Sequence, residues 1–311
     1  MLNAPFAASL ISALVLGSVA PVNADNSRVA DKDVSFISHG ATLRGTIYTP
    51  VEAPILAAAV WVDGAGETRR NPGLGRFLAR RGIAVLTYDK RGVGKSGGVY
   101  AGPEVGTNNV SPQNVALLAD DAGAALQSLL TEKELHGAPP GFIGGSQAGW
   151  IVPLAALKSR QARFMVLWSG AVETTHEDFL FEKVALADSA FWDHHTDEDV
   201  QKIMAGVPDH LSWASFDPRE ALSRLTIPGL WMFGGRDRNV NVELSIERLN
   251  GVIAAGHPDY SYRLFPEYDH ELGGEGADIV DPSVAWIRQV TGDLSRSCNN
   301  RGSRKRSSRG S

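Results

Sequence analysis

The sequence predicts an α/β fold, with a mostly parallel, doubly wound sheet and a helical cap inserted between two strands. Between residues 25 and 293, short β-rich runs alternate with segments of helical periodicity, which is typical of a parallel sheet covered on both faces. The connection over residues 171–228 is far longer than the usual link of about two to six residues. Helical patterns at 176–192 and 197–207 predict that this connection is the cap.

The expected elements follow from local patterns of apolar residues and from the glycines and prolines that bound them. The expected strands cover residues 34–50 (two strands turning at His39 and Gly40), 55–63, 83–89, 141–145, 164–170, 229–235 and 260–266. The expected helices cover residues 71–82, 112–130 and 147–159, and lie near 241–252 and 282–290. No internal repeat is visible.

The composition excludes several classes of protein. With 311 residues, 43% of them hydrophobic and 21% charged, the chain is neither disordered, collagen-like nor a multi-span membrane protein. The single cysteine, Cys298, excludes an intramolecular disulfide. A net charge of −5 argues against nucleic-acid binding by the body of the protein, because phosphate binding needs a basic surface.

Both ends are expected to lie outside the folded body. Residues 1–24 contain no charged side chain, and an apolar run ends in Val22-Asn23-Ala24, so we expect a signal peptide cleaved after Ala24. The run is shorter than the ~20 residues of a membrane span, so an exported protein, periplasmic or secreted, is favoured over an uncleaved anchor. The basic Ser/Arg-rich tail, residues 294–311, is expected to be disordered, with electrostatic attachment to nucleic acid or anionic lipid as the alternative.

The most informative segment for chemistry is Gly144-Gly145-Ser146-Gln147-Ala148-Gly149, between an expected strand and an expected helix. A serine on such a sharp turn has its hydroxyl exposed, and small neighbours are needed because backbone and helix approach closely. Ala148 departs from G-x-S-x-G by one methyl group. We therefore predict that Ser146 is a nucleophile; the alternative is a serine at a helix N-cap.

A serine nucleophile needs a base and an acid that orients the base. Asp237 and His270 follow the strands at 229–235 and 260–266, in the chain order nucleophile, acid, histidine. Both lie beyond the carboxyl ends of their strands, where open α/β sheets meet ligands. Asp269 is a weaker candidate for the acid, because it is the immediate neighbour of His270.

The N–H groups for a developing oxyanion are expected from Gln147 and from the loop after the strand at 55–63. That loop is Asp63-Gly64-Ala65-Gly66, and its small residues allow a close backbone approach. We assign the second donor to Ala65, with Gly64 and Gly66 as alternatives.

The body of the chain, residues 25–293, resembles a serine α/β-hydrolase of the bacterial dienelactone-hydrolase-like and serine-aminopeptidase-like group. The resemblance rests on residues 87–98, 141–156, 232–240 and 265–270. It implies an α/β-hydrolase fold with Ser146 as nucleophile, His270 as base and Asp237 as acid. Asp63 stands where family members usually have a histidine.

Three further residues are expected to contact substrate. Trp150 and Trp168 are predicted to line an acyl pocket, although both fit a core position equally well. Glu173 begins an acidic stretch that includes Glu177 and Asp178, and such a stretch can hold a free amine. The alternative for these acids is a charged first helical turn, which the helix dipole favours.

Two patterns are interpreted as structural. Residues 92–97 match G-x-G-x-x-G, but glycines and a proline follow, so no helix opens there to hold a pyrophosphate. His194 and His195 are adjacent and rarely converge on one ion, so we expect a polar turn and no metal.

The sequence therefore predicts an exported serine hydrolase that cleaves carboxylic esters by acyl transfer, without a cofactor or metal. Its expected partner is a small ester or amide substrate. Two alternatives remain: a serine peptidase of aminopeptidase or prolyl type on the same triad, and a catalytically silent binding protein. The sequence indicates no oligomeric state, and fold alone does not fix a substrate.

Overall fold

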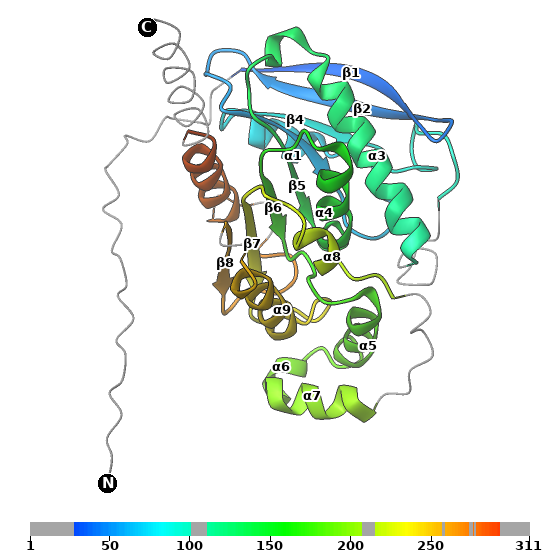
Figure 1. The fold of residues 1–311 in the computed structure, drawn as a ribbon, viewed down its shortest axis with the longest axis vertical. Helices are drawn as coiled ribbons and strands as arrows, with labels where there is room; N and C mark the ends of the chain where they lie inside the picture. Colours follow the sequence, from blue (N-terminus) through cyan, green and yellow to red (C-terminus); the bar gives the residue numbers. More distant parts are fainter. Residues whose placement is uncertain are drawn as a thin grey trace, which may run out of the picture.

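The computed structural model describes residues 28–100, 111–206, 215–256, 259–273, 276 and 278–292. The predicted signal peptide, residues 1–24, and the predicted disordered tail, residues 294–311, lie outside these described residues. Within the described ranges, no helix has the length and apolar character needed to cross a membrane. Figure 1 shows the fold.

One eight-stranded sheet organises the described residues, in the strand order β1-β2-β4-β3-β5-β6-β7-β8. Strands β1 and β2 are antiparallel additions at one edge, and the strands from β4 to β8 run parallel. This confirms the mostly parallel sheet that the sequence predicted. The strands are Val29–Ser38 (β1), Ala41–Pro50 (β2), Ala57–Val62 (β3), Ile83–Tyr88 (β4), Pro140–Gly145 (β5), Met165–Trp168 (β6), Gly229–Gly234 (β7) and Tyr260–Phe265 (β8).

The β1–β2 hairpin turns where the sequence indicated. His39 and Gly40 have φ values of 45° and 74°, so both central residues of the turn are left-handed. Such a turn matches the right-handed twist of the paired strands, and it pairs Ser38 with Ala41 at the end of the hairpin.

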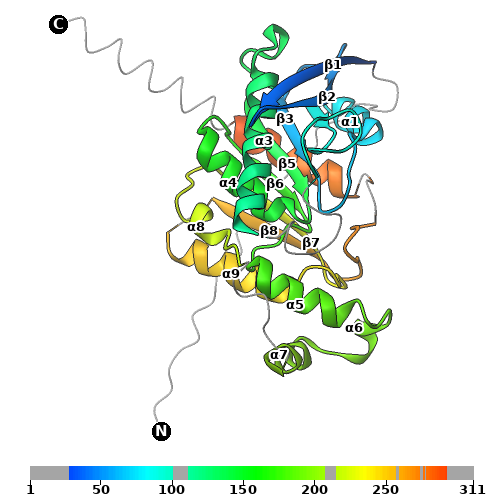
Figure 2. The ribbon, with the colours of Figure 1, turned by 90° about the vertical axis from the view of Figure 1, so that its right-hand side faces the viewer.

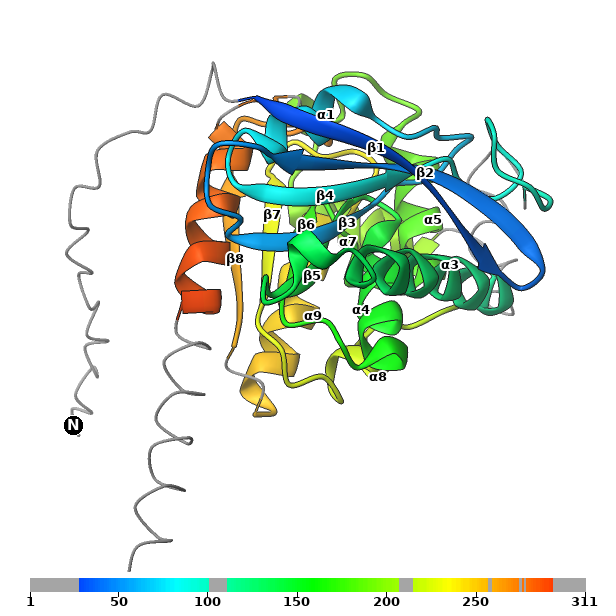
Figure 3. The same cartoon turned by 90° about the horizontal axis from the view of Figure 1, so that it is seen from above.

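Helices cover both faces of the sheet, and the sheet separates two apolar clusters of the core (Figure 3). One apolar cluster joins the sheet to α3 (Pro112–Leu130), α4 (Ala148–Ser159), α8 (Arg219–Leu222) and α9 (Val242–Ala254). The other joins the opposite face to α1 (Pro72–Ala79) and to a helix over residues 278–292. The side chains of β3 and β4 are buried on both faces, which is typical of parallel strands with continuous apolar runs.

The long connection between β6 and β7 is helical, as expected. It contains α5 (Thr175–Ala185), α6 (Phe191–His194), α7 (Asp197–Gly206) and α8. Helices α5 to α7 form a small layer below the sheet in Figures 1 and 2, with their own apolar cluster around Phe181 and Phe191. Helix α8 instead packs on the main body beside α4 and α9. The connection is therefore part cap and part body.

Helix starts follow the capping residues in the sequence. Asn71 and Ser111 accept hydrogen bonds from the N–H of the third residue of α1 and α3, and a proline follows each at the first helical position. Thr174 and Glu177 form a reciprocal capping box at the start of α5. Glu177 thus lies in the first turn of α5, where the helix-dipole alternative for the acidic stretch placed it.

Two glycines in helices provide a matched test of the packing around the β5–α4 turn. A Cβ on Gly149 would lie 2.3 Å from the Ala171 backbone nitrogen, whereas a Cβ on Gly123 in α3 would meet nothing within 4 Å. We expect Gly149→Ala to lower the free energy of unfolding by about 1–3 kcal/mol, because the backbone must move. Gly123→Ala should raise it by about 0.5–1 kcal/mol, because alanine is the better helix former. Urea unfolding measures both, and equal effects would contradict this packing.

Candidate functional site

Ser146 occupies a strained turn between β5 and α4. Its φ is 54°, in the left-handed region that non-glycine residues seldom adopt. The Ser146 N–H donates to the Trp168 carbonyl oxygen at 2.9 Å, which ties the turn to the end of β6. A Cβ on Gly144 would lie 2.6 Å from the Ala148 Cβ, so Gly144 leaves the space that Ala148 fills. The turn therefore exists because its neighbours are small.

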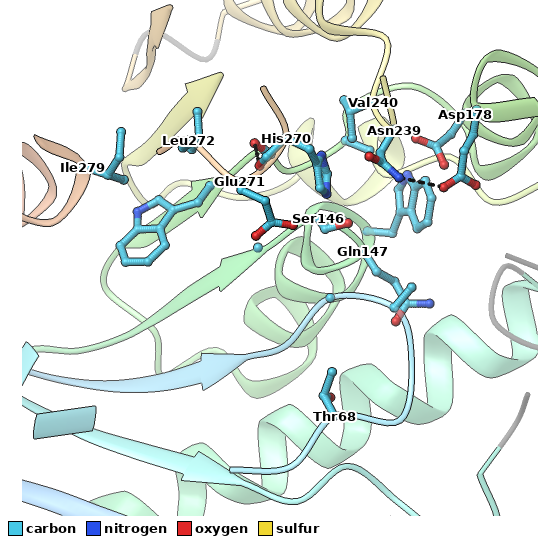
Figure 4. Close-up of a pocket in the computed structure, with 18 of the residues that line it drawn as sticks. Thr68, Ser146, Gln147, Asp178, Asn239, Val240, His270, Glu271, Leu272 and Ile279 are labelled. Carbon is cyan, nitrogen blue, oxygen red and sulfur yellow. Dashed lines mark hydrogen bonds between the residues drawn. The ribbon is translucent and has the colours of Figure 1, made fainter. Parts of the chain in front are cut away.

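A cavity of about 440 Å³ opens beside Ser146 at the carboxyl ends of the parallel strands. Its wall is built from the segments after β3, β5, β6, β7 and β8 and from α5 of the cap (Figure 4). Ser146 and His270 both line it. The size suits a small organic ligand, because such pockets are usually about 300–1,000 Å³.

His270 is oriented by Asp237, which follows β7. The His270 Nδ1 and the Asp237 Oδ2 are 2.8 Å apart, and the Asp237 side chain is completely buried. The other carboxylate oxygen of Asp237 accepts the Asn239 and Val240 N–H groups at 2.8 and 2.9 Å. The structure thus brings together the predicted acid and base. Asp269, the weaker candidate, accepts a hydrogen bond from the Glu271 N–H instead.

The environment raises the pKa of His270 above its ordinary value. Burial acts in the opposite direction, but the hydrogen bond and negative charge of Asp237 outweigh it, with smaller contributions from Glu271 and Glu182. The imidazole of His270 consequently binds a proton more readily than an ordinary histidine side chain does.

Cap residues also hold the loop that carries Asp237, the predicted acid. The Trp192 Nε1 of α6 donates to the Asp237 carbonyl oxygen at 2.6 Å. The Asn239 Nδ2 donates to the Glu182 Oε1 of α5 at 2.9 Å. On the other side, the Ser169 Oγ donates to the His270 carbonyl oxygen at 2.8 Å. Asp237 and His270 are therefore fixed from both the cap and the sheet.

The predicted oxyanion donors lie where the prediction requires a close approach. Gly64, Ala65 and Gln147 all line the cavity. A Cβ on Gly64 would lie 3.0 Å from the Ser146 Cβ, so the loop after β3 touches the nucleophile turn. Asp63 lies at the end of β3 and accepts a hydrogen bond from the Trp61 Nε1.

Lys90 is a neighbour of this loop that the sequence analysis did not identify. It is 5% exposed, and its ammonium donates to the Gly64 carbonyl oxygen at 2.6 Å and to the Gln147 Oε1 at 3.0 Å. The sequence offers little signal for it, because a lysine after a strand is ordinarily solvated.

Trp150 and Trp168 line the cavity and also belong to the core. Contact with an acyl group stays a prediction for both. The Trp150 Nε1 donates to the Glu173 carbonyl oxygen and the Trp168 Nε1 donates to the Ser283 Oγ. Each indole therefore has a fixed orientation and presents an apolar surface to the cavity.

Glu173 does not lie where a substrate contact would require. Its side chain is fully buried, and it accepts hydrogen bonds from the Val172 and Asn241 N–H groups and from the Ser245 hydroxyl. It is not one of the described residues that line the cavity. The prediction of direct contact is corrected for a physical reason: Glu173 precedes α5 and its carboxylate is used by the start of α9.

Asp178 and Glu182, one turn apart on α5, are the acids that line the cavity from the cap. Figure 4 shows Asp178. Asp178 is 6% exposed, and its Oδ1 has no hydrogen-bond partner among the described residues. Burial raises the pKa of Asp178 well above its ordinary value, and the charges of Glu173 and Glu182 raise it further. Burial also raises the pKa of Glu182 and that of Glu173, the latter to about 7. The sequence analysis included Asp178 in its acidic stretch but missed Glu182.

The two patterns interpreted as structural lie in a loop and at the end of a helix. Residues 92–97 form a loop with no helix after it up to residue 100, and Gly92 and Gly94 have positive φ. His194 bonds to Asp188 and His195 stacks on Phe191. Within the described ranges, no group of three or more potential ligands could hold a metal ion.

The comparisons with solved structures identify the fold. An esterase of Pyrococcus furiosus is 17% identical over 91% of this chain and 96% of its own, with a TM-score of 0.57. A Klebsiella pneumoniae structure assigned as a dienelactone hydrolase is 16% identical over 84% and 99%, with a TM-score of 0.58. An acylaminoacyl peptidase of Pyrococcus horikoshii is 14% identical over 85% of this chain but only 42% of its own, with a TM-score of 0.59.

No family model and no curated protein matches the sequence. The eight-stranded sheet and these structural neighbours together show an α/β-hydrolase fold. This confirms the fold that the sequence resemblance implied.

The contact between His270 and Asp237 predicts a measurable titration. As the pH falls, the imidazole of His270 should take up its proton at a pH above the ordinary midpoint of 6.5, because Asp237 stabilises the charged ring. Asp237→Asn should lower that midpoint, since the amide has no charge and keeps only one of the two acceptor oxygens. Nuclear magnetic resonance of the histidine ring checks both. Asp269→Asn is the control, and a shift in that variant alone would contradict the assignment of the acid.

Proposed function

We propose that the protein is a serine hydrolase that cleaves carboxylic esters by acyl transfer. The observation that carries the proposal is the left-handed turn at Ser146, which lines one cavity with His270 while Asp237 holds the other side of the imidazole. Strained backbone of this kind is concentrated at functional sites. The esterases among the structural neighbours support the same class of reaction.

In the first half of the proposed reaction, the His270 Nε2 takes the proton of the Ser146 hydroxyl as its oxygen attacks the ester carbonyl. Asp237 stabilises the imidazolium that forms. The N–H groups of Gln147 and Ala65 stabilise the negative charge on the former carbonyl oxygen. When the tetrahedral intermediate collapses, the alcohol leaves with the proton from His270 and an acyl-Ser146 remains.

In the second half, His270 takes a proton from water, and the resulting nucleophile attacks the acyl group. The intermediate collapses, Ser146 recovers its proton from His270 and the carboxylic acid leaves. The indoles of Trp150 and Trp168 provide the apolar surface against which we place the acyl chain. The proposed reaction uses no metal or organic cofactor.

We also propose export of the mature chain after cleavage behind Ala24. The support is the uncharged leader with its apolar run and small residues before the cleavage point. Sequencing of the mature N-terminus tests it: Asp25 as the first residue is expected, and an intact Met1 would contradict it.

Substitution of the nucleophile is the direct test of the reaction. Ser146→Ala should lower kcat/KM for short p-nitrophenyl esters by at least about 10⁴-fold, because no acyl-enzyme can form. The far-ultraviolet circular dichroism spectrum should be unchanged. A fluorophosphonate probe should label the natural protein but not this variant.

Ser169 is the matched control, because it also lines the cavity with a left-handed φ, here 47°. Ser169→Ala should still accept the probe. A folded natural protein that refuses the label would contradict the proposal and favour a silent binding protein on a hydrolase scaffold.

A second candidate function is a serine peptidase on the same triad that recognises the free amine of an aminoacyl substrate. The specific observation in its favour is the pair of carboxyl groups in the cavity wall, the buried Asp178 and the half-buried Glu182. The largest charge effects on Asp178 come from three other acids, Glu173, Glu182 and Asp237. A bound ammonium would supply the opposite charge and a donor for the Asp178 Oδ1.

Matched substrates separate the two candidates. The first pair is the p-nitroanilides of alanine and of propionic acid, and the second pair is their benzyl esters. Within each pair, the acyl part differs only by the amino group. For amine recognition, the natural protein should prefer the alanyl member of each pair and cleave its anilide. Asp178→Asn should then lower the alanyl-to-propionyl ratio of kcat/KM about ten- to hundredfold. Glu198→Gln, an exposed acid on α7, is the control, and an unchanged ratio in Asp178→Asn would contradict the peptidase.

A further inference from the structure

Lys90 stands directly behind the loop that carries one proposed oxyanion donor. It follows β4, and its own N–H donates to the Thr68 carbonyl oxygen at 3.1 Å. Its neighbour Asp89 accepts hydrogen bonds from the Arg70 backbone and guanidinium. The segment after β3 is thus fastened to residues 89 and 90 at both of its ends, because Gly64 is also bound by the Lys90 ammonium.

The two side-chain contacts of Lys90 reach the residues of both proposed donors. The carbonyl oxygen of Gly64, 2.6 Å from the ammonium, belongs to the same peptide group as the Ala65 N–H. The Oε1 of Gln147, 3.0 Å from the ammonium, belongs to the residue whose backbone N–H is the other donor. One cation therefore bridges the β3 loop and the start of α4, which are distant in sequence.

The surroundings make this ammonium costly to bury. Val62, Leu118 and Ile151 lie around it with Asp63 and Tyr88, and both oxygens that it contacts are neutral. Burial lowers the pKa of Lys90 to about 8, and the charge of Asp63 partly opposes this. Lysine is rarely buried unless a partner compensates it. Burial of the Lys90 ammonium therefore costs free energy of folding, and its contacts to neutral oxygens offset this cost only in part.

We propose that Lys90 is a positioning residue for the oxyanion hole: it fixes the Gly64–Ala65 peptide against Gln147 and strengthens the Ala65 N–H as a donor. The proposal rests on the proposed hydrolase function. A charge bound to the oxygen of a peptide group draws electrons from its nitrogen, so the N–H of that group donates more strongly.

This role has a particular kinetic signature. Lys90 is not one of the described residues that line the cavity, so it acts through the backbone and does not contact substrate. The donors it holds face charge that exists only in the transition state and the tetrahedral intermediate. Loss of Lys90 should therefore lower kcat and leave KM nearly unchanged.

Lys90→Met is the test, because methionine keeps most of the side-chain volume and removes the charge and both hydrogen bonds. We expect kcat for p-nitrophenyl butyrate to fall about ten- to hundredfold, less than the ~10²–10³ typical for loss of a donor itself. KM should stay within about twofold. The affinity for butylboronic acid, whose tetrahedral adduct places an oxyanion in the site, should fall by the same factor as kcat.

The pH profile gives a readout that a purely structural role would not move. In the natural protein kcat should decline as the pH rises through about 8, because the ammonium loses its proton. Asp63 and Tyr88 are the titratable groups that face it, and burial raises the pKa of Tyr88 well above 10, so the phenol stays neutral in this range. Lys90→Met should lack this decline.

Arg91→Met is the matched control, because Arg91 is also buried and binds Asp121 and the Ser38 carbonyl oxygen, away from both donors. It should lower the melting temperature without a matching loss of boronate affinity. Gln147→Met, which removes one acceptor and keeps the backbone donor, is the second variant and should lower kcat about three- to tenfold.

Unchanged kcat and boronate affinity in Lys90→Met would overturn the positioning role. A loss of boronate affinity in Arg91→Met that matches its fall in melting temperature would overturn it too. If Lys90→Met does not fold, an unchanged kcat in Gln147→Met overturns it. In each of these cases the proposed function still stands when the natural protein hydrolyses esters and Ser146→Ala does not. A natural protein that neither hydrolyses esters nor binds the boronate overturns both.

Discussion

The arrangement of the whole site depends on one backbone constraint, the left-handed conformation of Ser146. A side chain there costs free energy, about 1–2 kcal/mol, which the surrounding contacts must offset. Gly144, Gly149 and the Trp168 carbonyl oxygen provide those contacts from β5, α4 and β6. Because β5 lies between β3 and β6, the turn also fixes which loops can reach the serine. The loop after β3 and the end of β6 both contact it for that reason.

Much of the fold follows from local signals in the sequence. Helix α3 covers residues 112–130 as predicted, because Ser111 and Pro112 mark its start unambiguously. The strands β3 and β4 are continuous apolar runs, and burial on both faces requires such runs. The pairing of Asp237 with His270 was predicted from chain order and strand ends. Local chemistry and the rule for parallel strands were sufficient for these elements.

Other parts of the site depend on the phase and packing of elements, which the sequence does not state. Glu173 and Asp178 belong to one acidic stretch, yet α5 begins between them and turns only the second toward the cavity. Glu182 joins Asp178 because the two lie four residues apart on that helix. Lys90 follows a buried strand like many solvated lysines, and it is buried by the β3 loop together with side chains of α3 and α4. In each case a tertiary neighbour decides the role.

The hydrogen bond from Trp192 to the Asp237 carbonyl oxygen has a consequence for how this α/β-hydrolase fold can diversify. The insertion between β6 and β7 lines the cavity and also supports the backbone of Asp237. The shape of the cavity and the orientation of His270 therefore depend on the same segment. An exchange of the insertion for that of a relative would remove both Trp192 and the Glu182 partner of Asn239. The cap of this chain is therefore not an interchangeable module, and changes in the ligands that the cavity accepts are expected to arise by single substitutions along α5.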